Sequence, residues 1–519
     1  MYLGLHADRH PDRVAIRMED SPAEVLTYGQ LEAASNQCAH AWQALGLQPG
    51  DVVAIMLENC VEWAVAWWGA MRSGLYLTPV NWHLISSEVE YILANSGAKV
   101  LISGVSTAAD ARQACAQHPG IAHVQVGLGS GASGPGLDFW TLLNAQPATR
   151  IARELAGAAM FYSSGTTGKP KGIRPTLPGR PPGEVPSLPY SMMLTYGVRE
   201  GDVYLNTAPL YHTAPACFTF GAHAVGATSV VMRRFDAERA LALIESQQVT
   251  VSQWVPTMFQ RLLRLDEATR ARYDLSRLRT AVHAAAPCPP SAKRAMIDWW
   301  GPVLLEYYGS TEAGATVISS QEWLDHPGSV GRPWPDGPKM AVLDVSTRQP
   351  VPPGREGLIY FEPLGSHRIE YFKDPERTRE LYHDGMIATG DIGRLDEDGF
   401  LYLTDRVSDV IISGGVNIYP REIEFCLGEH PAVLDVAVFG IPDAEFGEQV
   451  MAVIQPAADA GPGPELGAEL TQWCRERLAG YKVPRAIDFV TDFPREENGK
   501  LYKRRLRDGY WKDHESRLI

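Results

Sequence analysis

Short apolar runs alternate with amphipathic stretches along most of the chain, and this rhythm predicts an α/β fold with mainly parallel sheets. A helical stretch followed by a strand recurs over residues 31–45 and 52–57, 87–94 and 99–103, 237–247 and 249–254, and 291–300 and 303–307. Thr27 and Gln30 have capping-box spacing before the first of these helices. The most apolar short stretch, residues 61–71, is about half a membrane span long and contains Glu62, so we expect a buried helix.

The last hundred or so residues predict a separate α+β unit. Its expected elements are a helix over 420–427, strands over 433–439 and 449–455, and a helix over 465–479. A strand over 400–403 precedes it, which gives two predicted domains, residues 1–405 and 406–519. Two loops stand out: residues 127–136 are rich in Gly and Ser, and the proline-rich residues 175–189 are expected to be extended and not to enter a helix.

Composition and charge exclude some classes of protein. The net charge of −14 argues against nucleic-acid binding, because such proteins usually present a basic surface. The seven cysteines are scattered and include no CxxC pair, as expected for reduced thiols in a cytoplasmic protein. The N-terminus has no apolar run typical of a signal peptide, and no integral membrane segment is expected.

The most informative segment is a loop over residues 162–172, YSSGTTGKPKG, which follows an apolar run. Glycines let backbone N–H groups approach phosphate oxygens, hydroxyls add donors, and lysines add positive charge, so this composition favours phosphate binding. It is not the classical P-loop, because only two residues separate Gly165 from Gly168 and Pro170 follows the lysine. A GxGxxG at residues 129–134 runs into Pro135 instead of a helix, which argues against dinucleotide binding.

This loop closely resembles the signature loop of adenylate-forming enzymes, the superfamily of acyl-CoA synthetases, peptide-synthetase adenylation domains and firefly-type luciferases. Further segments match in the family's order, at residues 307–312 (YYGSTE), 389–391 (TGD), 405–420 and 498–500 (NGK). The resemblance covers about residues 27 to 506. It implies a large N-terminal domain of parallel α/β subdomains with a β-barrel-like part, and a small mobile C-terminal α+β domain.

The resemblance implies a nucleotide site assembled from several of these segments. Its expected residues are Ser163, Ser164, Gly165, Thr166, Thr167, Gly168, Lys169, Ala285, Ala286, Pro287, Glu306, Tyr307, Tyr308, Gly309, Thr311, Asp391 and Arg406. Glu312 is a hard oxygen ligand suited to Mg²⁺, and Asp391 can accept hydrogen bonds from ribose hydroxyls. Taken alone, an isolated Thr-Gly-Asp would be read as an ordinary turn; its position in the ordered series favours the site.

The implied reaction needs little covalent chemistry from the protein, because the carboxylate substrate itself attacks the α-phosphate. Lys500 matches the family lysine that bridges carboxylate and phosphate, and the expected catalytic residues are Lys500, Thr166, Glu312 and His212. The basic residues 503–507 fit a solvated helix face, whereas Lys500 lies just beyond the Asn498–Gly499 turn, where a loop can present it. In the family the C-terminal domain then rotates about a hinge; here the hinge position is Ser408, where relatives commonly have Asp or Lys.

The two remaining substrates are assigned to two further groups of residues. Expected CoA-binding residues are Ser413, Gly414, Gly415, Phe446, Lys482 and Arg485, although a core Phe and surface cations fit the last three equally well. Expected residues of the acyl pocket are His212, Phe218, Trp254, Ala284 and Gly309, a mixture suited to a fatty, aromatic or steroid side-chain acid. The family's Thr-His pair after the phosphate loop is replaced by Arg174 and Pro175.

The sequence therefore predicts an acyl-CoA synthetase that uses ATP, Mg²⁺ and coenzyme A to activate a small-molecule carboxylic acid, expected to be bulky and apolar. Three alternatives stay open: an adenylation enzyme that loads a carrier protein, a luciferase-like oxygenase, and a non-catalytic acyl-adenylate binder. The intact matches at Glu312, Asp391 and Lys500 disfavour the last. A homodimer is an open alternative for the oligomeric state.

Overall fold

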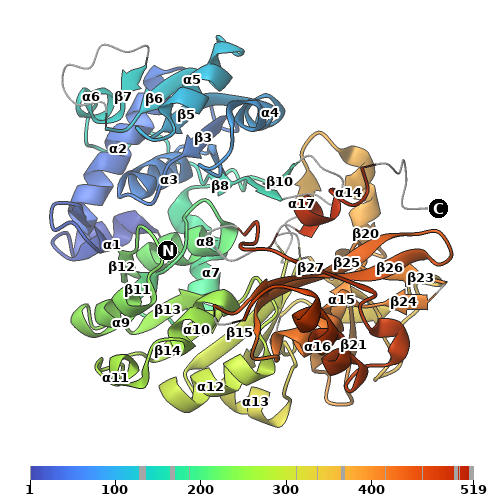
Figure 1. The fold of residues 1–519 in the computed structure, drawn as a ribbon. Helices are drawn as coiled ribbons and strands as arrows, with labels where there is room; N and C mark the ends of the chain where they lie inside the picture. The colour runs from blue at the N-terminus through green and yellow to red at the C-terminus, as the bar shows by residue number, and fades with distance from the viewer. Residues whose placement is uncertain are drawn as a thin grey trace. The chain divides into compact units, whose positions relative to one another are not determined.

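A computed structural model describes residues 2–127, 136–163, 170–185, 187–310, 313–335, 337–363, 369–414, 416–458, 460–495, 501 and 503–512 (Figure 1). The chain forms two compact units. Unit 1 comprises Met1–Ala284, Ala295–Leu305 and Pro363–Tyr382, and unit 2 comprises Ala285–Arg294, Glu306–Glu362 and His383–Ile519. Unit 2 thus contains segments that precede residue 405, and the division into domains 1–405 and 406–519 stays a prediction.

The first sheet of unit 1 is parallel, as the apolar runs predict. Its strand order is β7-β6-β5-β3-β4-β8. The strands are β3 (Val52–Met56), β4 (Tyr76–Pro79), β5 (Ala98–Ser103), β6 (Ala122–Gln125), β7 (Leu137–Asp138) and β8 (Ala158–Ala159). Every residue of β3 is buried, as is typical of a parallel strand with both faces covered. The intervening helices are α3 (Glu62–Arg72), α4 (Ser86–Ser96), α5 (Ala108–Ala116) and α6 (Phe139–Asn144).

A second sheet of unit 1 contains the strand series β14-β13-β11-β12-β1-β2, in which the neighbours from β14 to β1 are parallel. The strands are β1 (Val14–Met18), β2 (Val25–Thr27), β11 (Val203–Asn206), β12 (Thr228–Val231), β13 (Val251–Trp254) and β14 (Thr280–His283). The helices that accompany them are α1 (Leu3–Arg9), α2 (Tyr28–Ala44), α8 (Thr213–Val225), α9 (Ala237–Ser246), α10 (Pro256–Leu263) and α11 (Glu267–Arg270). Helix α12 (Pro290–Trp300) follows β14 and passes from unit 2 into unit 1.

A small antiparallel sheet in unit 1 has the order β19-β10-β9, with β9 (Phe161–Ser163), β10 (Lys171–Pro175) and β19 (Ile369–Tyr371). Helix α14 (Pro375–Leu381) follows β19. The prediction that residues 175–189 avoid helices is wrong, because η1 (Pro182–Glu184) is a 3₁₀ turn and α7 (Leu188–Thr195) begins inside the stretch. Pro189 lies in the first turn of α7, where a missing N–H costs nothing, and Ser187 caps the helix.

Unit 2 contains an antiparallel sheet with the path β17-β18-β21-β20 and β22 paired to β21. These strands are β17 (Met340–Leu343), β18 (Gly357–Phe361), β20 (Tyr382–His383), β21 (Met386–Leu395) and β22 (Leu401–Arg406). They follow β15 (Leu304–Gly309), which begins in unit 1, β16 (Ala315–Ser319) and α13 (Ser320–Asp325). A β-rich segment is therefore present between the parallel sheets and the C-terminal α+β part, where the resemblance implies one.

The C-terminal part of unit 2 is an α+β arrangement, as predicted. Its sheet has the path β24-β23-β26-β25, with β27 added on β26. The elements are β23 (Ile411–Ser413), β24 (Val416–Ile418), α15 (Pro420–Gly428), β25 (Val433–Asp443), β26 (Gly447–Pro456), α16 (Pro464–Arg475), η2 (Gly480–Lys482), β27 (Ala486–Phe489) and α17 (Lys503–Arg507). Helix α16 ends four residues before the predicted residue 479, and Leu478 packs against the core from the following turn.

Local predictions elsewhere also have clear outcomes. Thr27 and Gln30 form the expected capping box of α2, and α3 is the expected buried helix. All seven cysteines are free. No helix within the described ranges has both the length and the apolar composition needed to span a bilayer. The interpretation of residues 503–507 as a solvated helix face is wrong at Lys503, whose Nζ lies 2.7 Å from Glu424 Oε1 of α15.

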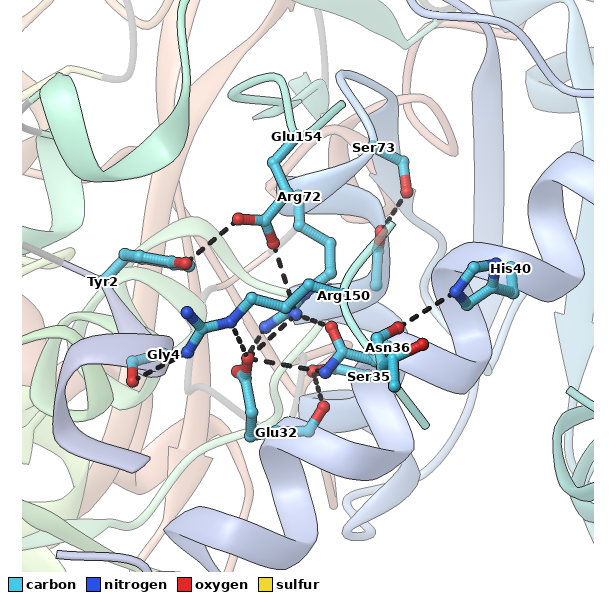
Figure 2. Close-up of polar contacts among 12 residues, drawn as sticks. Tyr2, Gly4, Glu32, Ser35, Asn36, His40, Arg72, Ser73, Arg150 and Glu154 are labelled. Carbon is cyan, nitrogen blue, oxygen red and sulfur yellow. Dashed lines mark hydrogen bonds and ion pairs between the residues drawn. The ribbon is translucent and has the colours of Figure 1, made fainter. Parts of the chain in front are cut away.

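A cluster of charges around the buried Arg72 ties the N-terminal helices of unit 1 to the segment before β8 (Figure 2). Arg72, at the end of α3, is 1% exposed and pairs with Glu32 of α2 at 2.5 Å and with Glu154 at 3.3 Å. Arg150 donates from Nε to Glu32 Oε1 at 2.8 Å, and the Tyr2 hydroxyl donates to Glu154 Oε2 at 3.0 Å. Two arginines and two glutamates therefore neutralise one another in a place that sequence spacing did not indicate.

Candidate functional site

Three residues predicted to bind the nucleotide meet in unit 2 around the carboxylate of Asp391. The Tyr308 hydroxyl donates to Asp391 Oδ2 at 2.7 Å, and Arg406 Nε donates to Asp391 Oδ1 at 3.1 Å. Asp391 and Arg406 are opposite each other in the register of β21 and β22, so the antiparallel ladder brings them together. Residues that lie far apart in the sequence thus form one group, named here the Asp391 group (Tyr308, Asp391 and Arg406).

The Asp391 group is only partly enclosed. Asp391 is 13% exposed and Arg406 is 58% exposed. Burial, and then the neighbouring Asp391 carboxylate, raise the pKa of Tyr308 well above its ordinary value, so Tyr308 is a hydrogen-bond donor at neutral pH. A carboxylate has about four acceptor sites. Asp391 can therefore accept a hydrogen bond from a diol such as ribose while it holds Tyr308 and Arg406.

The predicted small-residue strip, Ala284 to Pro287, begins at the end of β14. Ala284 is buried, whereas Ala285 and Pro287 are exposed. Ala285 has a φ of 73°, a left-handed conformation that is uncommon for a residue with a Cβ. Such conformations cluster at ligand sites and persist only where the surroundings hold them. Small exposed side chains here leave the backbone accessible to a flat ring.

The other predicted residues of β15 have different surroundings. The carboxylate of Glu306 lies 2.5 Å from Lys293 Nζ, and this partner was not predicted from the sequence. Tyr307 is half-buried. A Cβ on Gly309 would lie 2.9 Å from the Gly314 carbonyl oxygen, so close approach of the backbone requires glycine at this position. Gly309 therefore has a local structural reason apart from its predicted place in the acyl pocket.

The predicted phosphate loop joins two paired strands of unit 1. Ser163 at the end of β9 is opposite Lys171 at the start of β10. Ser164, Gly165, Thr166, Thr167, Gly168 and Lys169 lie outside the described residues, as do Thr311, Glu312, Gly415 and Lys500. The side chain of Ser163 is likewise not described. The predictions for these ten positions and for the Ser163 side chain stay predictions.

Strand β10 follows the predicted phosphate loop, and its contacts show what holds it in place of the family's Thr-His pair. The guanidinium of Arg174 lies 4.8 Å from the ring centroid of Tyr76 and 4.6 Å from that of Phe372. The Tyr76 hydroxyl also donates to the Pro175 carbonyl at 2.8 Å. Cation–π contacts to two rings thus fix β10 against its neighbours at the positions where the family pattern has Thr-His.

The residues predicted for the acyl pocket lie on elements of unit 1. His212 precedes α8, and its ring centroid lies 4.2 Å from that of Tyr211, with the two ring planes tilted by 47°. Phe218 is completely buried, and its ring centroid lies 5.2 Å from that of Tyr196 and 6.1 Å from that of Tyr204.

Trp254, at the end of β13, is 1% exposed, and its ring centroid lies 5.2 Å from that of Trp300. Its indole donates to Ser252 Oγ at 2.7 Å. Phe218 and Trp254 therefore belong to packed aromatic surroundings, and their contact with a substrate stays a prediction.

Most of the predicted CoA-binding residues that the structure describes lie together. Arg485 is 4.3 Å from the ring centroid of Phe446, and Gly414 N–H donates to the Phe446 carbonyl at 2.8 Å. Gly414 has a φ of 57°, and a Cβ there would lie 3.0 Å from the Phe446 ring. Ser413 pairs with Gly447, the residue after Phe446. Lys482 differs from this group, because its Nζ pairs with Glu422 at 2.5 Å.

The neighbourhood of Ser408, the predicted hinge position, contains interactions that sequence analysis missed. Ser408 Oγ donates to Asp409 Oδ1 at 3.1 Å. Asp405 accepts from the backbone N–H of Arg421 at 2.9 Å, near the start of α15. Burial raises the pKa of Asp405. The position of Asp405 just before the predicted Arg406 is the only signal in the sequence that could have indicated the hydrogen bond to the start of α15, and it is weak.

Comparisons with known proteins show the family to which the chain belongs. The family model of AMP-binding enzymes matches residues 4–364, and that of the AMP-binding enzyme C-terminal domain matches residues 422–500. The long-chain-fatty-acid–CoA ligase FadD13 of Mycobacterium tuberculosis is 33% identical over 515 residues, 96% of each chain. The fatty acid–[acyl-carrier-protein] ligase ScoC of Streptomyces coeruleorubidus is 32% identical over 98% of this chain and 95% of its own.

A solved structure is also similar to this chain over nearly its whole length. The o-succinylbenzoate CoA synthetase MenE of Bacillus subtilis, in complex with its acyl-adenylate intermediate, aligns with a TM-score of 0.82 and 28% identity. The alignment covers 98% of this chain and 97% of that one.

Proposed function

Because the chain belongs to the family of AMP-binding enzymes, we propose that it is an ATP-dependent acyl-CoA synthetase with a bulky apolar acid as substrate. The observation that carries this proposal is the Asp391 group, which offers a partly exposed carboxylate flanked by a donor hydroxyl and a guanidinium. This arrangement suits the ribose of ATP and of an acyl-adenylate. The exposed small residues at Ala285 and Pro287 suit the adenine ring.

Two half-reactions follow from this assignment. In the first, a carboxylate oxygen bonds to the α-phosphorus of ATP and the bond to the β-phosphate breaks, which releases pyrophosphate. In the second, the CoA thiol attacks the acyl carbon, AMP leaves, and the thiol proton is lost to solvent. Residues 163–169 and Lys500 would neutralise the phosphates during the first step, and Glu312 would hold the Mg²⁺ that draws charge from them.

The proposal for CoA is supported by the contacts around Phe446. Its ring already has the Arg485 guanidinium on it, at 4.3 Å, and Phe446 is half-buried, not part of the core. A half-buried ring beside an exposed guanidinium suits a purine with phosphate groups nearby. We assign Ser413, Gly414, Gly415, Phe446 and Arg485 to CoA, with Ser408 as the hinge between domains 1–405 and 406–519.

The acid is proposed from the packing of unit 1. His212, Phe218 and Trp254 come from the neighbourhood of α8 and β13, and Phe218 and Trp254 are buried in aromatic packing. A pocket bounded by such side chains would favour a medium- or long-chain fatty acid, an aromatic acid or a ring-bearing side-chain acid. The names of the relatives, which include ligases for a long-chain fatty acid and for o-succinylbenzoate, are compatible with this range.

A second candidate is an enzyme that transfers the acyl group to a carrier protein. It is favoured by one observation, the similarity to the carrier-protein ligase ScoC over nearly the whole chain. The first half-reaction would be the same, and only the thiol acceptor would differ.

A single panel of assays tests both candidates. The purified protein is incubated with ATP, Mg²⁺ and a library of acids, and pyrophosphate exchange is measured first. Free CoA or a phosphopantetheinylated carrier protein is then added as acceptor. We expect AMP, pyrophosphate and an acyl-CoA as products; stoichiometric ADP and phosphate would rule out the adenylate mechanism, and acyl transfer to carrier protein alone would select the second candidate.

A further inference from the structure

A buried ion pair joins two of the segments predicted to contact the nucleotide. Lys293 Nζ lies 2.5 Å from Glu306 Oε2, and the two side chains are 1% and 7% exposed. Removing two charges from water is costly, and apolar residues of similar size often stabilise a fold as well as a buried pair does. A buried pair between parts of a binding site therefore raises the question of a role besides stability.

Lys293 is fixed by a second contact. Its Nζ lies 4.9 Å from the ring centroid of Trp323 in α13, and the guanidinium of Arg294 lies 5.6 Å from the same ring. Trp323 is 2% exposed. A cation held between a carboxylate and a ring face has little freedom to move, so the start of α12 is held firmly at this point.

The positions of the two residues decide what the pair connects. Lys293 lies six residues after Pro287, the end of the small-residue strip that contains the left-handed Ala285. Glu306 lies two residues before Tyr308 on β15, and residues two apart in a strand point to the same face. Tyr308 in turn donates to Asp391. The pair therefore spans from the strip to the strand that carries the Asp391 group.

We propose that Lys293 and Glu306 are positioning residues that set the distance between the strip at residues 285–287 and β15, so that adenosine meets a preformed surface. This inference rests on the proposed function. It gives Glu306 an indirect role, through Lys293, instead of the direct contact with nucleotide expected from the sequence. The left-handed Ala285 fits this role, because that conformation persists only where its neighbours hold it.

The test separates positioning from stability by removing both charges together. The double variant Lys293→Met/Glu306→Met removes both charges of the pair together. Arg421 loses the electrostatic support of Glu306 but keeps that of Asp405 and Asp391, and we expect the thermal midpoint to stay near that of the wild type. Its dissociation constant for AMP, measured by calorimetry, should rise by about tenfold because a preorganised surface is lost. The KM for ATP in pyrophosphate exchange should rise in parallel, while kcat at saturating ATP changes much less.

A control uses a different ion pair, whose arginine is 41% exposed. Arg279 and Asp202 form a bidentate pair in unit 1, with N–O distances of 2.7 and 3.2 Å, next to the N-terminal end of β14. The variant Arg279→Met/Asp202→Asn should leave the AMP dissociation constant within about twofold of the wild type. The reason is that this pair does not join two segments that are predicted to contact the nucleotide.

Further variants keep the proposal testable if the charge-free protein does not fold. The reversed pair Lys293→Glu/Glu306→Lys restores the tether and should recover most of the AMP affinity. Lys293→Arg keeps the charges but changes their reach, and should weaken AMP binding several-fold at nearly unchanged stability. A folded double-Met or Lys293→Arg variant with wild-type AMP affinity would overturn the positioning role. Absence of ATP and AMP binding in the wild type would instead refute the proposed function.

Discussion

Two regions of this protein contain the same three kinds of side chain joined in the same way. In unit 1, Glu154 accepts from the Tyr2 hydroxyl at 3.0 Å and pairs with Arg72 at 3.3 Å (Figure 2). In unit 2, Asp391 accepts from Tyr308 at 2.7 Å and from Arg406 at 3.1 Å. The arginines differ sharply, since Arg72 is 1% exposed and Arg406 is 58% exposed. Identical chemistry therefore serves the fold in one place and is open to a ligand in the other.

The physical difference lies in the number of partners that each arginine has. Arg72 also pairs with Glu32 and donates to Asn36, and Glu32 in turn accepts from Arg150. A buried cation with several fixed partners has no capacity for a ligand, and its loss would leave charges stranded. A carboxylate near the surface with two partners can still accept hydrogen bonds. The comparison makes predictions that differ in kind for the two regions.

The largest expected effect is on stability, from Arg72→Met. This change leaves the carboxylates of Glu32 and Glu154 without their main counter-charge in a buried place, which should cost about 3–5 kcal/mol. Arg406→Met is the matched variant; its exposed pair should contribute about 1 kcal/mol or less to stability. Thermal and chemical unfolding of both variants measures the difference. Equal destabilisation by the two changes would show that exposure does not separate the regions.

The next effect is on nucleotide binding, from Asp391→Asn. The amide keeps the shape but removes the charge, so a charge-assisted hydrogen bond to ribose worth about 1.5–3 kcal/mol is lost. We expect the KM for ATP in pyrophosphate exchange to rise by about 10- to 100-fold, with little change in unfolding. Glu154→Gln should do the opposite, lowering stability with the KM for ATP unchanged. A normal KM in Asp391→Asn would remove Asp391 from the nucleotide site.

Burial in unit 1 also predicts a dependence of stability on pH. Burial lowers the pKa of His223 to about 3, against about 6.5 in the unfolded chain. The folded state therefore disfavours the charged ring. The free energy of unfolding is at its full value above about pH 6.5 and declines as the pH falls toward 3, because the unfolded chain binds a proton that the folded chain does not. At pH 5 the loss should be about 2 kcal/mol.

A variant isolates the contribution of this one histidine. His223→Gln keeps an acceptor for the Trp68 indole, which donates to His223 Nδ1 at 3.2 Å, but cannot titrate. Its thermal midpoint should fall less steeply between pH 6.5 and 5 than that of the wild type. Parallel curves for the two proteins would mean that His223 titrates alike in the folded and unfolded states.

The smallest expected effects come from two matched tyrosines. Tyr2→Phe and Tyr308→Phe each remove one hydrogen bond to a carboxylate, worth about 1.5 kcal/mol, the low end for a bond to a charged group. Tyr2→Phe should lower the free energy of unfolding by that amount and leave the KM for ATP unchanged. Tyr308→Phe should raise that KM about fivefold, because Asp391 loses the donor that orients it. Melting curves and pyrophosphate exchange on both variants would sharpen the comparison, and a KM effect in Tyr2→Phe would contradict it.

The sequence by itself determined the elements and the order of the motifs. Apolar runs such as residues 52–56 and the Thr27–Gln30 capping box are local patterns, and local patterns survive folding. The resemblance of the ordered motifs to adenylate-forming enzymes also indicated Tyr308, Asp391 and Arg406, although not the ladder register that brings two of them together. Proline at a helix start is a local pattern too, yet the position of α7 was missed because the composition of residues 175–189 outweighed it in the prediction.

Only the tertiary structure decided which polar residues pair and which of them are enclosed. Lys293 and Glu306, or Arg72 and Glu154, are separated along the chain by distances that carry no periodic signal. Whether a Tyr–carboxylate–Arg group stabilises the fold or is open to a ligand depends on how many other chain segments surround it. Desolvation and Coulomb interactions act through space, so a linear pattern does not encode them.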